Sequence, residues 1–175
     1  MVVVMKKVSE DFVMNVKAAR KEWGNALVLD STISGAMKKL DPDFPIGKVK
    51  VPGSRWMEGQ SIMSIWEGLK VFSKKDVVDL SFLKDEKKLG KRRGCKSYGK
   101  LVGIKIGDEV IDVERAVEEV FVKIYKETVM SRFGNTIECL KNESEKRTVV
   151  LLDYAEGDER YPVSHVEILK EMIDK

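Results

Sequence analysis

The chain has 175 residues, of which 43% are hydrophobic and 35% are charged, and its formal net charge is +3. A chain of this length fits a single domain over residues 1–175 that buries most of its apolar surface. Its longest apolar runs, such as Met1–Met5, are far shorter than the roughly 20 residues that cross a bilayer, which excludes a membrane span and argues against a secretory signal.

Two further features of the composition indicate where the protein works. Cys95 and Cys139 match no disulfide scaffold and no metal-ligand spacing, so we expect a soluble protein of the reducing cytoplasm. Gln60 is the only glutamine and His165 the only histidine, whereas Lys and Glu are abundant. This balance resembles proteins from hot environments, in which ion-pair networks replace heat-labile amides.

Apolar periodicity and turn residues predict the elements of the first half of the chain. Ser9 can cap a helix that begins at Glu10 and ends near Trp23. Five elements are then expected in chain order: a buried strand over 26–29, a short helix over 35–40, a possible edge strand over 48–51, an amphipathic helix over 59–72 and a helical turn over 76–83.

The second half combines a hairpin, long helices and one strongly apolar strand. Strands over 101–106 and 109–113 flank a Gly-Asp pair that suits a tight hairpin. The remaining elements are a helix over 113–131, a break at 133–135, a shorter helix over 136–146, a buried strand over 148–153 and a helix capped by Ser164 that runs to Ile173. Because the strands are few and scattered, this order predicts an α+β fold, a single helix-rich domain with a small sheet, rather than a regular βαβ winding.

The common phosphate-binding and nucleophile motifs are missing from the sequence. It contains no G-x-x-x-x-G-K-[ST], no G-x-G-x-x-G and no G-x-S-x-G. With one histidine, a zinc site is nearly excluded, and we expect neither a metal nor a cofactor. Any catalysis should therefore depend on carboxylates and cations.

The first candidate group lies in the helix predicted over 59–72. Glu67 follows Trp66 at the rim of an apolar face, where desolvation raises the pKa of an acid and suits it to proton transfer. Lys70, three residues on, can pair with Glu67 or hold a phosphate. The alternative is an ordinary surface Glu–Lys pair beside a buried tryptophan.

The second candidate group follows the last predicted strand. Asp153 stands at the exit of this strand, Asp158 lies in the following loop, and His165 begins the last helix. An acid at the end of a buried strand, near a helix N-terminus, is a frequent place for a site. Asp153 could equally be a structural hydrogen-bond acceptor, Asp158 a loop acid, and His165 a satisfied partner.

The third candidate group is the basic segment 84–100. It holds eight basic side chains against two acidic ones, including Arg92 and Arg93, which suit bidentate phosphate contacts. Such a segment attracts the phosphate of a nucleotide, a sugar or a nucleic acid. The alternative is a solvated loop.

Over about residues 30–173, the segments VPGSRWMEGQSIMSIWEGLKVF, RRG and LLDYAEGDERYPVSHVEILK resemble an uncharacterised family of small microbial proteins. More remotely, the order of elements is similar to the NADAR superfamily, which acts on NAD- and ADP-ribose-related nucleotides and includes N-glycosidases. This resemblance implies a helix lysine at Lys70 and late acids at Asp153 and Asp158. The helix acid of the superfamily does not match, because Met63 takes its place and Glu67 stands one turn later, where glutamine is expected.

These observations predict a hydrolase of ribosyl N-glycosidic bonds in a nucleotide or ADP-ribose-like substrate. Glu67, Asp153 and Asp158 are the expected catalytic acids, and the expected substrate-binding residues are Trp66, Lys70, Arg92, Arg93 and His165. Two alternatives stay open: a non-catalytic binder of nucleotide or nucleic acid that uses segment 84–100, and a structural or partner-binding protein. The oligomeric state is left open.

Overall fold

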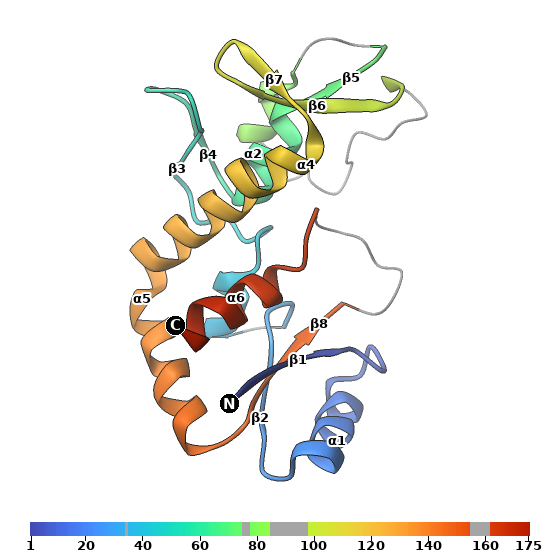
Figure 1. The fold of residues 1–175 in the computed structure, drawn as a ribbon, viewed down its shortest axis with the longest axis vertical. Helices are drawn as coiled ribbons and strands as arrows, with labels where there is room; N and C mark the ends of the chain where they lie inside the picture. The colour runs from blue at the N-terminus through green and yellow to red at the C-terminus, as the bar shows by residue number, and fades with distance from the viewer. Residues whose placement is uncertain (34, 75–77, 85–97, 155–161) are drawn as a thin grey trace. The chain divides into compact units, whose positions relative to one another are not determined.

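The computed structural model describes residues 1–33, 35–74, 78–84, 98–154 and 162–175, which form a mixed helix-and-strand fold with small sheets, compatible with α+β (Figure 1). The chain divides into two compact units, Met1–Asp41 with Thr128–Lys175, and Pro42–Glu127. We call these unit 1 and unit 2; a single domain stays a prediction from chain length. No helix in the described ranges is long and apolar enough to span a membrane.

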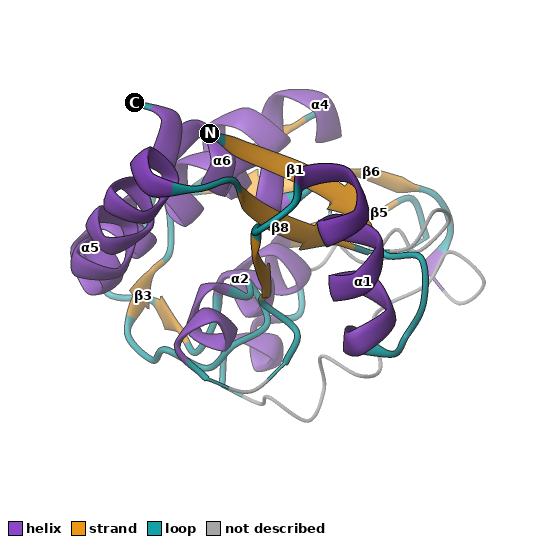
Figure 2. Cartoon of the chain, turned by 90° about the horizontal axis from the view of Figure 1, so that it is seen from below, coloured by secondary structure: helices purple, strands orange, loops and turns teal. Residues whose placement is uncertain are grey.

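Unit 1 contains a three-stranded parallel sheet with the strand order β1-β8-β2 (Figures 1 and 2). Its strands are β1 (Val2–Lys6), β2 (Leu27–Asp30) and β8 (Val149–Asp153), and β1 and β2 both run parallel to the fully buried β8. The strands at 26–29 and 148–153 are thus confirmed. The sequence analysis missed β1 and the parallel pairing, although the run of β-branched valines in β1 favours a strand.

Helix α1 (Phe12–Trp23) connects β1 to β2 and packs on the sheet. Its cap differs from the prediction: Asp11, not Ser9, accepts the Val13 N–H, and the Ser9 hydroxyl accepts the Asp11 N–H instead. The helix therefore begins at Phe12. The core on this side of the sheet consists of Ala19, Ala26, Val28, Val150 and Leu152.

Helix α6 (His165–Asp174) contacts β1 and β8 and closes the chain. The Ser164 hydroxyl accepts the Glu167 N–H at 3.3 Å, which confirms the predicted cap. Buried residues Val166, Leu169 and Ile173 form the apolar side of α6. A 3₁₀ turn over Ala36–Leu40 takes the place of the short helix predicted there, and it leads to Asp41.

Unit 2 is built around helix α2 (Ile62–Leu69), in which all eight residues are buried. Ser61 and Ser64 cap its first turn reciprocally through their side chains and backbone N–H groups. The helix predicted over 59–72 is wrong in its last turn: Lys70 has an extended backbone, and Lys70–Phe72 forms strand β5. Residues 70–72 continue the helical spacing of apolar residues, but they hydrogen-bond to the strand at Leu101–Ile106 and are therefore extended.

Strand β5 is one edge of an antiparallel sheet with the order β5-β6-β7. Strands β6 (Leu101–Ile106) and β7 (Glu109–Ile111) form the predicted hairpin, with Gly107 at positive φ in its turn. A short ladder pairs β3 (Val49–Lys50), which confirms the predicted edge strand, with β4 (Glu58–Gly59). The helical turn expected over 76–83 is a 3₁₀ turn over Leu80–Leu83.

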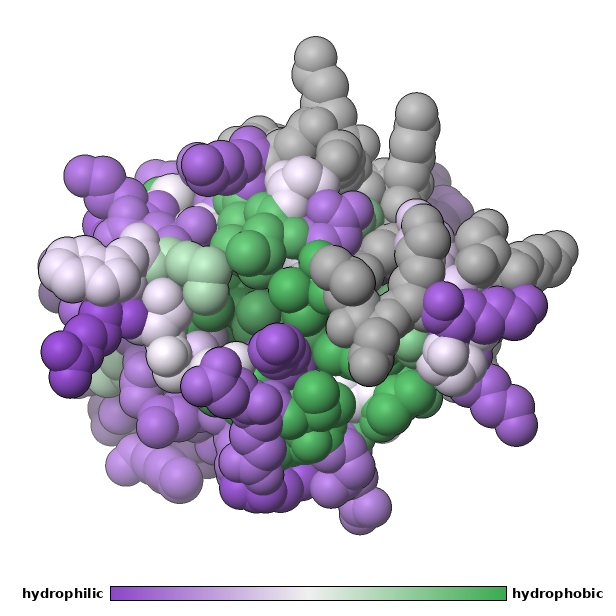
Figure 3. Space-filling model, turned by 90° about the horizontal axis from the view of Figure 1, so that it is seen from above, coloured by the Kyte–Doolittle hydropathy of each residue, from purple (hydrophilic) through white to green (hydrophobic). Residues whose placement is uncertain are grey.

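The long helical stretch runs through α4 (Val113–Ala116), a π-helical segment (Val117–Val122) and α5 (Lys123–Lys146). The break predicted at 133–135 is present as a kink, because Phe133 has non-helical φ and ψ of −132° and 23°. Hydrophilic side chains cover much of the face in Figure 3 around an apolar patch, as expected of a chain in which 35% of residues are charged.

Candidate functional site

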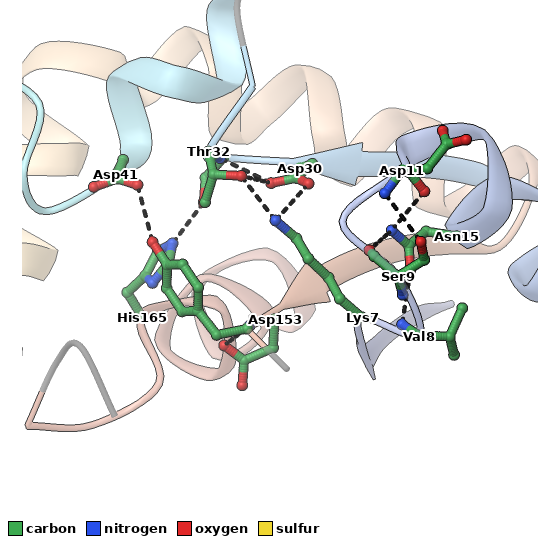
Figure 4. Close-up of polar contacts among 12 residues, drawn as sticks. Lys7, Val8, Ser9, Asp11, Asn15, Asp30, Thr32, Asp41, Asp153 and His165 are labelled. Atoms are coloured by element: carbon green, nitrogen blue, oxygen red, sulfur yellow. Dashed lines mark hydrogen bonds and ion pairs between the residues drawn. The ribbon is translucent and has the colours of Figure 1, made fainter. Parts of the chain in front are cut away.

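The carboxyl ends of the three parallel strands bring polar side chains together at one edge of the sheet in unit 1. Because β1, β2 and β8 run in the same direction, their last residues Lys6, Asp30 and Asp153 end at this edge. In open sheets with parallel strands, ligands bind outside the carboxyl ends of the strands. Helix α6 begins here as well, and Figure 4 shows His165 beside Asp41 and near Asp153.

A buried ion pair joins the ends of β1 and β2 (Figure 4). The Lys7 Nζ lies 2.8 Å from the Asp30 Oδ2 and 2.8 Å from the Thr32 hydroxyl. The other Asp30 oxygen accepts the Thr32 N–H at 2.8 Å and the Thr32 hydroxyl at 2.6 Å. The two ionic side chains are only 10% and 3% exposed, so this network fixes the loop that follows β2.

The side chain of His165 lies in the same cluster. Its Nε2 shares a 2.7 Å hydrogen bond with the Ser31 hydroxyl, and both residues are buried. Burial lowers the pKa of His165 to about 4, although the charges of Asp41, Asp153 and Asp30 act to raise it. The imidazole is therefore neutral at pH 7 and can accept or donate one hydrogen bond at each nitrogen according to its tautomer.

Asp153, at the end of β8, is buried and has defined partners. Its Oδ2 accepts a 2.8 Å hydrogen bond from the half-exposed Lys6 ammonium, and its Oδ1 accepts the Tyr154 N–H at 2.9 Å. The Tyr154 hydroxyl hydrogen-bonds the Asp41 Oδ2 at 3.3 Å, and the Lys7 ammonium lies 5.7 Å from the centre of the Tyr154 ring. Tyr154 thus links two carboxylates of the cluster.

Taken together, the edge holds three carboxylates, a neutral imidazole and a buried ammonium group. Such a set can stabilise positive charge on a bound group, accept a proton from water and orient hydroxyl groups. Among the residues that the structure describes, no group of His, Cys, Asp and Glu side chains is arranged to hold a metal ion. We call Lys7, Asp30, Ser31, Asp41, Asp153, Tyr154 and His165 the edge cluster.

The other predicted group, Trp66 with Glu67 and Lys70, lies in unit 2. Glu67 is 1% exposed, and its carboxylate accepts a 2.6 Å hydrogen bond from the Lys70 ammonium. Trp66 is buried and packs edge-on against Phe121, with ring centroids 5.8 Å apart. The expected Glu–Lys contact is thus present, but the pair is buried and not at the surface.

Three predicted site residues, Arg92, Arg93 and Asp158, lie outside the described residues, as does most of segment 84–100. Of the predicted residues, the structure brings Asp153 and His165 together in unit 1, and it brings Trp66, Glu67 and Lys70 together in unit 2. Their catalytic and binding roles stay predictions.

The sequence analysis overlooked Lys7, Asp30, Ser31 and Asp41. A strand assignment for the valine run of β1 would have placed Lys7 at a strand end, and Asp30 follows a strand that was predicted. Because parallel strands end at one edge, the two could then have been expected near Asp153. No comparable signal exists for Asp41, which follows a 3₁₀ turn.

Fold and site together define a small mixed helix-and-strand protein with a buried polar cluster at the carboxyl edge of a parallel sheet. A family profile described as a family of unknown function, DUF6939, matches residues 13–169. The chain belongs to this family. No curated protein shows significant similarity to the chain.

Proposed function

We propose that the protein hydrolyses ribosyl N-glycosidic bonds in a nucleotide or ADP-ribose-like substrate, and that the edge cluster is its reactive centre. One observation supports this proposal most strongly. The carboxylates of Asp41 and Asp153 both hydrogen-bond Tyr154, whose ring centroid lies 6.0 Å from that of the buried His165. Carboxylates close to a neutral imidazole suit a reaction that develops positive charge on a sugar.

The proposed reaction breaks the bond between ribose C1′ and the base nitrogen. The bonding electrons leave with the base, and the ribose ring becomes positively charged, as in glycoside hydrolysis. The Asp153 carboxylate stabilises this charge. A water molecule then adds its oxygen to C1′ and gives up a proton, for which the neutral His165 imidazole is the acceptor. The imidazolium passes this proton to the released base, or to solvent when the base leaves uncharged, and becomes neutral again.

The proposed substrate class rests on the resemblance of the sequence to the NADAR superfamily, and a NADAR-like fold is part of the same proposal. The family match over residues 13–169 carries no activity of its own. Of the two predicted catalytic acids that the structure describes, Asp153 and Glu67, Asp153 has the surroundings that better support the proposal, because it neighbours other carboxylates and an imidazole. Phosphate binding by Arg92 and Arg93 and contact of the base with Trp66 stay predictions from the sequence.

Burial of the edge cluster sets a requirement on the reaction. Asp153, His165 and Ser31 are each no more than 3% exposed. A substrate can therefore reach them only when the groups that cover them move. The competing explanation is that the cluster serves only the stability of unit 1, because hydrogen-bonded buried polar groups also specify a fold.

A turnover experiment tests the proposal. The protein is incubated separately with ADP-ribose, NAD and phosphorylated pyrimidine ribosides, and the released base is measured by chromatography. We expect release from at least one of them, and loss of about 100-fold or more of this rate in His165→Gln if the imidazole takes the proton. Absence of release from every substrate by the folded protein would refute the proposal.

A further inference from the structure

An exposed tryptophan stands at the tip of the β3–β4 hairpin in unit 2. Trp56 is 90% exposed, more than any other large apolar side chain in the described part of the chain, and the adjacent Met57 is 37% exposed. Leaving an indole ring in water forgoes roughly 2–3 kcal/mol of burial free energy. The ring is thus available to a ligand.

Backbone contacts hold the segment that carries Trp56 in one conformation. The Ser54 hydroxyl accepts the Trp56 N–H at 3.2 Å and the Met57 N–H at 3.0 Å, and the Val51 N–H donates to the Met57 carbonyl at 3.0 Å. The turn also rests on a second hairpin: a Cβ on Gly53 would lie 2.9 Å from the Gly107 nitrogen. A backbone held in this way loses little conformational entropy on binding.

The charges around Trp56 favour an anionic ligand. Over residues 48–58 the side chains of Lys48, Lys50 and Arg55 are basic, and Glu58 is the only acidic one. Arg55 and Lys50 are exposed, and Lys48 is held at a positive φ of 53°. In the β3–β4 register Lys50 lies opposite Glu58, whereas Arg55 precedes Trp56 in the loop. An exposed aromatic ring and these cations in one hairpin offer a stacking surface and contacts for phosphate.

We propose that the β3–β4 hairpin is a binding site for single-stranded nucleic acid, in which Trp56 stacks on an unpaired base and Arg55 and Lys50 contact its phosphates. Base pairing hides the faces of bases in a duplex, whereas single strands expose them. A lipid surface would require a broader apolar patch, whereas over residues 48–58 the exposed large apolar side chains are Trp56 and Met57. This site is separate from the edge cluster and does not depend on the proposed hydrolase activity.

Fluorescence anisotropy with a labelled single-stranded oligouridylate tests this site. We expect binding by the full chain at low salt, and about 5- to 140-fold weaker binding by Trp56→Ala, the loss of one base–aromatic stack. Trp56→Phe should retain part of the affinity. Leu80→Ala removes another exposed apolar side chain of unit 2, 40% exposed, and should bind like the wild type.

A strand of the same length without bases distinguishes stacking from charge attraction. The wild type should bind the abasic strand about as weakly as Trp56→Ala binds oligouridylate, and Arg55→Ala with Lys50→Ala should lower the salt dependence of binding. The proposal is overturned by absence of binding, by equal affinity for the two strands, or by binding to anionic vesicles but not to oligouridylate. Because Trp56 is so exposed, unchanged thermal unfolding should confirm that its variants fold.

Discussion

Lys7→Met should destabilise unit 1 far more than the same change at its neighbour Lys6. Lys7 is paired with Asp30 at 2.8 Å, and the two side chains are 10% and 3% exposed. Lys6 is paired with Asp153 at the same distance, but its side chain is 61% exposed. The two lysines are adjacent in sequence, so comparing them isolates the effect of burial.

The size of the effect follows from the carboxylate that is left behind. Removing one partner of a buried ion pair costs about 3–5 kcal/mol, because the remaining charge is not compensated. Asp30 keeps two hydrogen bonds from Thr32 in the variant, which favours the lower end, about 3 kcal/mol. The Lys6 ammonium is exposed, so water can take its place beside Asp153, which also keeps its hydrogen bond from the Tyr154 N–H. Lys6→Met should therefore cost only about 1 kcal/mol.

Urea unfolding followed by circular dichroism measures both losses. A double-mutant cycle with Asp30→Asn adds an internal check, since Lys7→Met with Asp30→Asn removes both charges. The double variant should be about 2 kcal/mol more stable than the sum of the two single losses predicts. Equal losses for the two lysine variants, or additive losses in the cycle, would refute the reasoning that the Lys7–Asp30 pair is buried and coupled.

Three further outcomes are expected. His165 has a pKa of about 4 in the folded state against 6.5 in the unfolded state, so the free energy of unfolding should fall by up to about 3 kcal/mol as the pH drops from 6.5 to 4. His165→Gln should lack this pH-dependent loss. The NMR titration of His165, the sole histidine, should have its midpoint near pH 4. Gly103→Ala should lower the unfolding free energy by about 1–3 kcal/mol, because its Cβ would lie 2.1 Å from the Ile111 carbonyl oxygen, whereas Gly134→Ala, with open space, should raise it by up to about 1 kcal/mol. Lys70→Met should cost about 3 kcal/mol in urea unfolding, because it removes the ammonium group from the buried Glu67 carboxylate. A loss under about 1 kcal/mol would contradict this and show that other contacts compensate the charge of Glu67.

Local signals in the sequence predicted much of the secondary structure. The Gly-Asp turn, the apolar run of β8 and the Ser164 cap each act within a few residues, and each is present in the structure. The errors occurred where distant contacts decide. Lys70–Phe72 continues the apolar period of α2 but pairs with β6, and its backbone is extended there.

The edge cluster illustrates the same limit for the candidate site. Asp153 and His165 were noticed because each stands next to a strand or helix end in the sequence. Lys7 and Asp30 join them only through the parallel pairing of β1 and β2 with β8, strands that are more than 100 residues from β8 in the chain. Spacing along the sequence does not reveal such pairing, so Lys7 and Asp30 can be placed near Asp153 only once β1 is recognised as a strand of the same parallel sheet.

The most direct test of the proposed reactive centre compares base release by Asp153→Asn with that by Glu22→Gln, an exposed acid on α1 in the same unit. Both variants lose one carboxylate charge, and thermal unfolding reports whether each is folded. If Asp153 stabilises the charged ribose, the folded Asp153→Asn protein should release base at least about 100-fold more slowly than wild type, and Glu22→Gln should match wild type. Wild-type turnover in folded Asp153→Asn would contradict the assignment and leave the edge cluster a structural role.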